Sequence, residues 1–186
     1  MPLVSTKALK ENLGSLYKEN LLYDTELKTK TGSFPAHKNI LSAHSEVFRK
    51  MFASDMKEKS TGCVVIEDLD DDTVHKMLLY IYTATMPDLL WDSACNLYAA
   101  ADKYEILSLK GECSSFLKDH LSSDNALDLL ILADMHQDEY LKSSIKDCRF
   151  NVPSVERINV IFKPFKSDIP RRSHLLKNKV QQKTFG

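Results

Sequence analysis

The feature that most constrains the fold of this 186-residue chain is a change of apolar period near Lys38. Before it, residues 23–34 are rich in β-branched and aromatic residues around a turn that contains Gly32, which predicts a β-hairpin. After it, apolar residues recur at helical intervals, first over 38–43 and then over 46–54. A hairpin followed by helices predicts an α+β fold that is mainly helical.

The rest of the pattern extends this prediction toward the C-terminus. Residues 64–66 form a short apolar run that predicts a buried strand. Asp70 to Asp72 place negative charge where a helix begins, and Pro87 stops that helix. Helical periods then predict four more helices, at residues 93–104, 107–121, 125–135 and 138–148.

The first helix, expected over 6–17, carries an apolar stripe. Leu9, Leu13 and Leu16 stand at positions i, i+4 and i+7, so they share one face. Gly14 weakens the helix by up to about 1 kcal/mol. A helix this short needs a partner surface to be stable, either within its own domain or on a second chain.

Composition excludes several functions. The formal net charge of −1 gives no electrostatic reason to bind nucleic acid or an anionic membrane. The N-terminus has no apolar signal region, and no apolar run approaches the roughly 20 residues that span a bilayer. We therefore expect a soluble protein of the nucleus or cytoplasm. In those compartments the widely spaced cysteines are expected to be free thiols; they are Cys63, Cys95, Cys113 and Cys148.

No catalytic constellation is visible. The six histidines are scattered, and no nucleophile elbow, metalloprotease motif or phosphate-binding glycine loop is present. Ligand pairs at zinc spacing are missing as well. The sequence therefore predicts a protein that is not an enzyme and has no cofactor, metal or small-molecule substrate.

Several segments resemble the signatures of the BTB/POZ family. They are residues 34–41 (FPAHKNIL), 45–52 (SEVFRKMF), 79–83 (LYIYT) and 99–104 (AAADKY), within about residues 6–121. Residues 129–136 (LLILADMH) also resemble the helices that follow this core in the speckle-type POZ protein group. That group carries a substrate-binding MATH domain, which has no counterpart in these residues.

The resemblance implies an organisation in three parts. Residues 1–121 would form a BTB/POZ domain, a small sheet flanked by a helical cluster, with the first helix used for dimerisation. Residues 122–148 would form a helical extension similar to a 3-box. Residues 149–186 contain three prolines and many basic residues, and we expect a poorly ordered tail there. Its charges are either a nuclear localisation signal or a solvated surface.

The resemblance also implies a dimer interface, which Leu9, Leu13, Leu16 and Ile40 would line. The alternative is that the same stripe packs within its own chain. Asp24 and Lys38 would form a buried charged pocket near that interface. A buried charge needs its partner, since losing it costs about 3–5 kcal/mol; the alternative is two surface charges.

Residues 56–58 (MKE) resemble the hydrophobic-x-Glu motif through which BTB domains engage cullin-3. Met56 would be an apolar anchor and Glu58 a charged hydrogen-bonding group, with Phe52 and Tyr82 as the floor beside them. The alternative is a solvated charged loop.

These residues predict a dimeric adaptor that recruits a cullin-3 RING ubiquitin ligase for protein ubiquitination and degradation. Its expected partners are itself, related BTB proteins and cullin-3. Two other functions stay open. One is a cullin-independent scaffold or transcriptional regulator. The other is an inhibitory dimer partner of full-length relatives.

Overall fold

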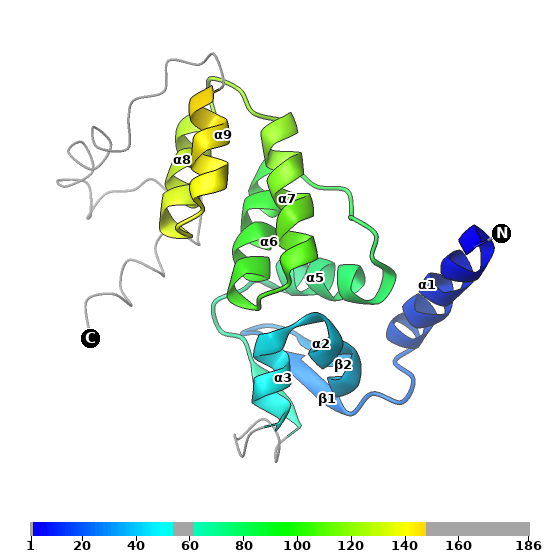
Figure 1. Ribbon diagram of the computed structural model, residues 1–186. Helices are drawn as coiled ribbons and strands as arrows, with labels where there is room; N and C mark the ends of the chain where they lie inside the picture. Colours follow the sequence, from blue (N-terminus) through cyan, green and yellow to red (C-terminus); the bar gives the residue numbers. More distant parts are fainter. Residues whose placement is uncertain (1, 54–61, 148–186) are drawn as a thin grey trace. The chain divides into compact units, whose positions relative to one another are not determined.

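The computed structural model describes residues 2–53 and 62–147 (Figure 1). The chain forms two compact units. The first joins Met1–Leu89 with Asn96–Glu112, and the second joins Leu90–Cys95 with Cys113–Gly186. Met56 and Glu58, and the tail predicted at 149–186, lie outside the described residues.

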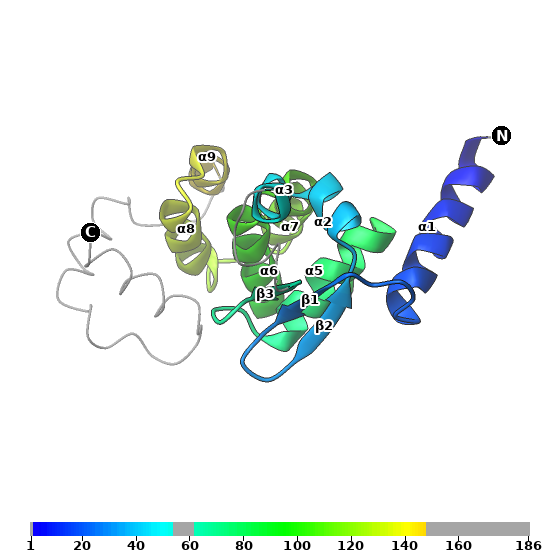
Figure 2. The same cartoon turned by 90° about the horizontal axis from the view of Figure 1, so that it is seen from below.

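A small mixed sheet confirms the predicted hairpin and strand. β1 (Thr25–Lys28) pairs antiparallel with β2 (Ser33–Ala36) and parallel with β3 (Cys63–Val65), giving the order β2-β1-β3 (Figure 2). Leu27 and Val64 are buried, so one face of the sheet contributes to the core. Pro35 lies on the edge strand β2, opposite Glu26, where a proline is tolerated.

The hairpin turn is fixed to the start of α5 (Asp71–Thr83). The hydroxyls of Thr29 and Thr31 donate to the two carboxylate oxygens of Asp71, the second over 2.9 Å. A Cβ atom at Gly32 would lie 2.9 Å from that carboxylate, so a larger residue at this position would have to displace the Asp71 side chain. No local pattern indicates this contact, which links residues about 40 positions apart.

Side-chain caps mark the start of two helices of the first unit, α3 (Glu46–Ala53) and α5. α2 (Lys38–His44) and α3 are separated by Ser45, whose hydroxyl accepts the Phe48 amide N–H at 3.1 Å and donates to the Tyr104 carbonyl. Asp70 caps α5 by accepting the Thr73 amide N–H at 2.7 Å. α1 (Pro2–Lys18) begins four residues earlier than predicted.

The remaining helices confirm the predicted spans to within two residues. They are α6 (Trp91–Lys103), α7 (Leu107–Asp119), α8 (Ala126–Met135) and α9 (Glu139–Asp147). The described chain is thus mostly helical with one small mixed sheet, as its apolar periods predict.

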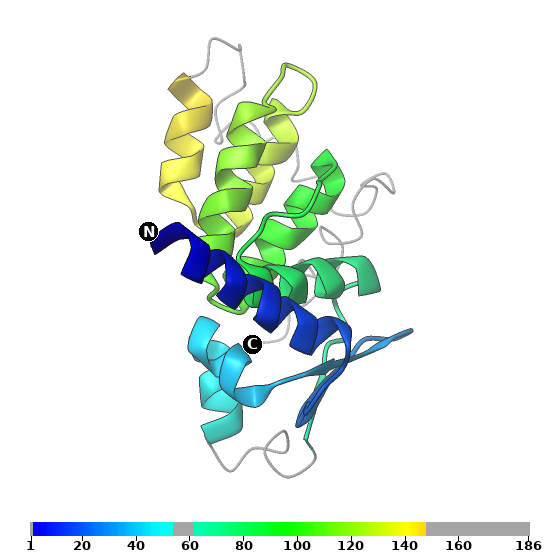
Figure 3. The same cartoon turned by 90° about the vertical axis from the view of Figure 1, so that its right-hand side faces the viewer.

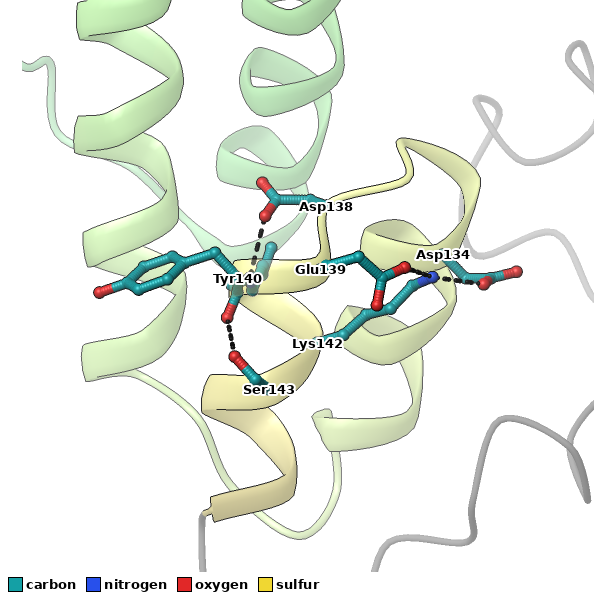
Figure 4. Close-up of polar contacts among 7 residues, drawn as sticks. Asp134, Asp138, Glu139, Tyr140, Lys142 and Ser143 are labelled. Carbon is teal, nitrogen blue, oxygen red and sulfur yellow. Dashed lines mark hydrogen bonds and ion pairs between the residues drawn. The ribbon is translucent and has the colours of Figure 1, made fainter.

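In the second unit, α8 packs against α9 around a buried lysine (Figure 4). The Lys142 side chain is only 11% exposed, and its ammonium pairs with Asp134 at 2.8 Å and Glu139 at 2.7 Å. These hydrogen bonds raise the pKa of Lys142. Asp138 caps α9 by accepting the Leu141 amide N–H at 2.9 Å. The lysine therefore joins the last turn of α8 to the first turn of α9.

Candidate protein-interaction site

Helix α1 packs on α5 through a face that the leucine pattern did not indicate (Figure 3). Gly14 is buried there, and a Cβ atom at this position would lie 3.2 Å from the Thr83 methyl group. Tyr17 is also buried and stacks on Tyr82, with ring centroids 4.9 Å apart. Gly14 and Tyr17 are three residues apart, so they share a helical face that lies on α5.

The predicted leucine stripe lies partly outside this contact. Leu9 is 58% exposed, while Leu13, Leu16 and Ile40 are half-buried. The stripe therefore keeps apolar surface available in the single chain. Its assignment to a dimer interface stays a prediction, and the alternative of packing within the chain is realised only in part.

His37 connects three segments of the first unit. Its backbone N–H donates to the Tyr82 hydroxyl at 2.9 Å, and its Nδ1 and Nε2 atoms lie 2.7 Å from the Tyr82 hydroxyl and the Leu21 carbonyl. A carbonyl only accepts, so Nε2 carries a hydrogen. In the neutral imidazole Nδ1 then accepts the Tyr82 hydroxyl proton. One buried histidine thus links the residues after α1, the start of α2 and the end of α5.

The two stacked tyrosines are buried, which disfavours the charged form of each phenol. Burial raises the pKa of Tyr17 to about 12. Burial also raises the pKa of Tyr82 to about 12, against the opposing effect of the His37 backbone N–H. The Tyr17 hydroxyl lies 3.1 Å from Nδ1 of His75, whose side chain is exposed. The two phenols are therefore neutral parts of the α1–α5 contact.

A stack of three aromatic rings includes Phe52, one of the predicted cullin-binding residues. Phe48 stacks on Tyr104 at 4.7 Å and on Phe52 at 6.2 Å, between ring centroids. Phe48 and Tyr104 are buried, whereas Phe52, near the end of α3, is half-buried. Tyr82 is only 1% exposed, so it can support a partner surface only from beneath. The two motif residues themselves lie in the segment that the structure does not describe.

Asp24 and Lys38 meet, but through the backbone. The Asp24 carboxylate accepts the Lys38 backbone N–H at 2.8 Å, at the first residue of α2. The Lys38 ammonium lies 5.7 Å from the centroid of the Phe52 ring. Across 2–53 and 62–147, no ion pair joins this carboxylate to this ammonium. Asp24 is exposed in the single chain, and the buried pocket stays a prediction that requires a second chain.

The described residues contain no cluster of side chains suited to bind a metal ion, since no group of three or more His, Cys, Asp or Glu among them could hold one. Desolvation of the half-buried Cys95 thiol, with Asp92 and Asp128 nearby, raises its pKa to about 12, which disfavours the reactive thiolate at neutral pH. In the same part of the chain, no helix has the length and apolar content to cross a membrane.

More than half of this chain matches a known protein family. The BTB/POZ domain model matches residues 13–121. TD and POZ domain-containing proteins 4 and 3 of Mus musculus are 41% and 42% identical over 145 and 140 residues, which is 77% and 75% of this chain. The chain spans only about two fifths of the length of these relatives.

The fold has a counterpart among solved structures. The BTB domain of zebrafish PATZ1 superposes with a TM-score of 0.54 at 22% identity, over 62% of this chain and 92% of that domain. At this identity the likeness concerns the fold alone. The curated relatives are TD and POZ domain-containing proteins, and the narrower likeness to the speckle-type POZ group stays a prediction.

Proposed function

Because this chain belongs to the BTB/POZ family, whose domains commonly dimerise and bind partner proteins, we propose that it is a self-associating adaptor that recruits a cullin-3 RING ubiquitin ligase. BTB/POZ domains are non-enzymatic interaction modules. The ubiquitin-transfer chemistry would then reside in other subunits. The chain would act by geometry alone, holding the ligase beside whatever its partners bind.

Self-association is supported by the two faces of α1. The Gly14–Tyr17 face fixes the helix on α5, which satisfies the need of this helix for a partner surface. The leucine face keeps Leu9 exposed and Leu13 half-buried. A helix that is already docked presents these leucines in a fixed orientation, which lowers the entropic cost of binding a second copy.

The proposal of cullin recruitment is supported by the aromatic stack at the end of α3. Phe48, held between Tyr104 and Phe52, gives the end of α3 a rigid base. The segment with Met56 and Glu58 follows directly. Their spacing of two would put both side chains on one side of an extended segment. An apolar anchor and a charge-assisted hydrogen bond could then act on the same partner surface.

The cullin assignment is tested by Met56→Asp with Met86→Asp as the matched control. Losing a central anchor costs about 2 kcal/mol or more, roughly thirtyfold in affinity for the cullin-3 N-terminal domain in calorimetry. Met86, a half-buried methionine after α5, should not affect this affinity. Both melting temperatures should stay close to wild type. Wild-type affinity in Met56→Asp would refute the assignment. A wild-type chain that does not bind would favour the cullin-independent scaffold.

Self-association is tested separately, by the double substitution Leu13→Asp with Leu16→Asp. Sedimentation should show a dimer for the wild type and a monomer for the variant, with circular dichroism confirming that the variant is folded. An unchanged dimer mass would contradict the α1 interface. We also propose mixed dimers with related BTB proteins, and a location in the nucleus or cytoplasm.

A further inference from the structure

Three consecutive apolar residues are exposed in the link between α1 and β1. Leu21 is 46% exposed, Leu22 87% and Tyr23 48%. A run of three exposed apolar residues is unfavourable in water unless it has a function. No sequence pattern marks Leu21 or Leu22, and Tyr23 is predicted only as the start of the hairpin.

The backbone at Leu22 is strained. Its φ of 57° lies in the left-handed region, which L-residues other than glycine occupy at a cost because their Cβ atom comes too close to the following carbonyl oxygen. Four other described non-glycine residues have positive φ, and each follows the end of a helix by one or two residues, where this conformation is usual. They are Asn20, Ala84, Glu105 and Gln137. Helix termination therefore does not explain the strain at Leu22.

Hydrogen bonds on both sides hold this conformation in place. The Leu21 backbone N–H donates to the Leu16 carbonyl at 3.1 Å, and its carbonyl accepts from Nε2 of His37 at 2.7 Å. The Asp24 N–H donates to the Ala36 carbonyl at 3.1 Å. The surrounding structure thus holds the Leu22 side chain in an exposed position and keeps its backbone strained. Backbone strain of this kind is typical of binding sites.

We infer that Leu22 is an anchor of the contact with a second copy of this chain, an inference that rests on the proposed self-association. The segment continues directly from the leucine stripe, because the amide of Leu21 bonds to the carbonyl of Leu16 in that stripe. A stable dimer buries about 800 Å² per partner, which one exposed leucine cannot supply. Leu21 and Leu22 together expose more than twice the fraction that Leu9 does.

A second copy is the occupant that this placement favours. A two-fold contact uses the same patch on both chains, so an anchor next to the stripe occurs twice in each dimer. Fully burying one leucine is worth about tenfold in affinity or more. Removing it from both chains should therefore raise the dimer dissociation constant by about a hundredfold.

The test compares Leu22→Asn with Leu90→Asn in the full chain. Asparagine tolerates positive φ, so the first change keeps the backbone and removes the apolar side chain. Leu90 is 80% exposed and lies outside the segment, directly before α6. Sedimentation equilibrium should give about a hundredfold weaker dimer for Leu22→Asn and no change for Leu90→Asn. Leu22→Gly should also weaken the dimer, while at dilutions that leave both proteins monomeric its melting temperature equals that of the wild type or is higher.

Each outcome decides the matter. An unchanged dissociation constant in Leu22→Asn would overturn the inference and leave self-association through α1 intact. A lower melting temperature in Leu22→Gly without a weaker dimer would assign Leu22 to folding instead. Equal losses in Leu22→Asn and Leu90→Asn would show that replacing any exposed leucine weakens the dimer, and would overturn the inference. A wild type that is monomeric at all concentrations would overturn both this inference and the proposed self-association.

Discussion

Removing one oxygen atom, in Tyr82→Phe, should destabilise the first unit far more than the same change at Tyr17. The Tyr82 hydroxyl bonds to both the backbone N–H and Nδ1 of His37, which is only 8% exposed. The substitution leaves a buried donor and a buried acceptor without partners, at about 1–3 kcal/mol each. In Tyr17→Phe the lost partner is His75, whose exposed ring can bond to water instead. That loss should be about 1 kcal/mol.

The assay is urea unfolding of both variants, with the free energy of unfolding extrapolated to water. We expect a loss of about 2–6 kcal/mol for Tyr82→Phe and about 1 kcal/mol for Tyr17→Phe. Both variants keep the stacked rings, so the comparison isolates the hydroxyl groups. Equal, small losses in the two variants would refute the assignment of His37 as the link between α1, α2 and α5.

Three further predictions follow from the buried ionisable groups. In the folded chain the pKa of Tyr17 and of Tyr82 is about 12, above the unfolded value near 10. The stability that the neutral phenols confer is therefore complete below pH 10 and is lost as the pH rises toward 12. Urea unfolding at pH 9, 10 and 11 should show the free energy of unfolding decline by up to about 1.4 kcal/mol per pH unit for each phenol. Cys95 should resist iodoacetamide at pH 8 in the folded chain and react in urea, and rapid native labelling would contradict its raised pKa. Lys142→Met should lower the free energy of unfolding by only about 1 kcal/mol, because the carboxylates of Asp134 and Glu139, 44% and 79% exposed, can be hydrated once the lysine is gone. A larger loss in thermal unfolding would show that these carboxylates depend on the lysine.

The sequence predicted the elements well, because each one is specified locally. The caps at Ser45 and Asp70 lie beside the helices that they start, and the hairpin turn carries its own glycine. Predicted helix spans and the family membership therefore agree with the structure and the comparisons. Local signals of this kind need no knowledge of distant residues.

The features that were missed depend on contacts between distant residues. Helix propensity predicts that Gly14 weakens α1, whereas its missing side chain allows close packing on Thr83, 69 positions later. Its three-residue spacing from Tyr17 was the one available signal. The positive φ at Leu22 had no sequence signal, since leucine rarely adopts it. The cullin motif at Met56 remains a prediction from resemblance.

Pro35 has a consequence for how the chain behaves when crowded. Thr29 donates its amide to the Gly32 carbonyl, and counting along the register from that bonded pair places Pro35 opposite Glu26 at a non-bonded position. At that position the missing proline N–H is on the outer edge of β2, where an incoming strand would need a donor. Pairing of another chain's strand with β2, the first step of fibril-like growth, is therefore discouraged. The fold thus limits nonspecific strand pairing at this edge while other surfaces of the chain remain available for partner proteins.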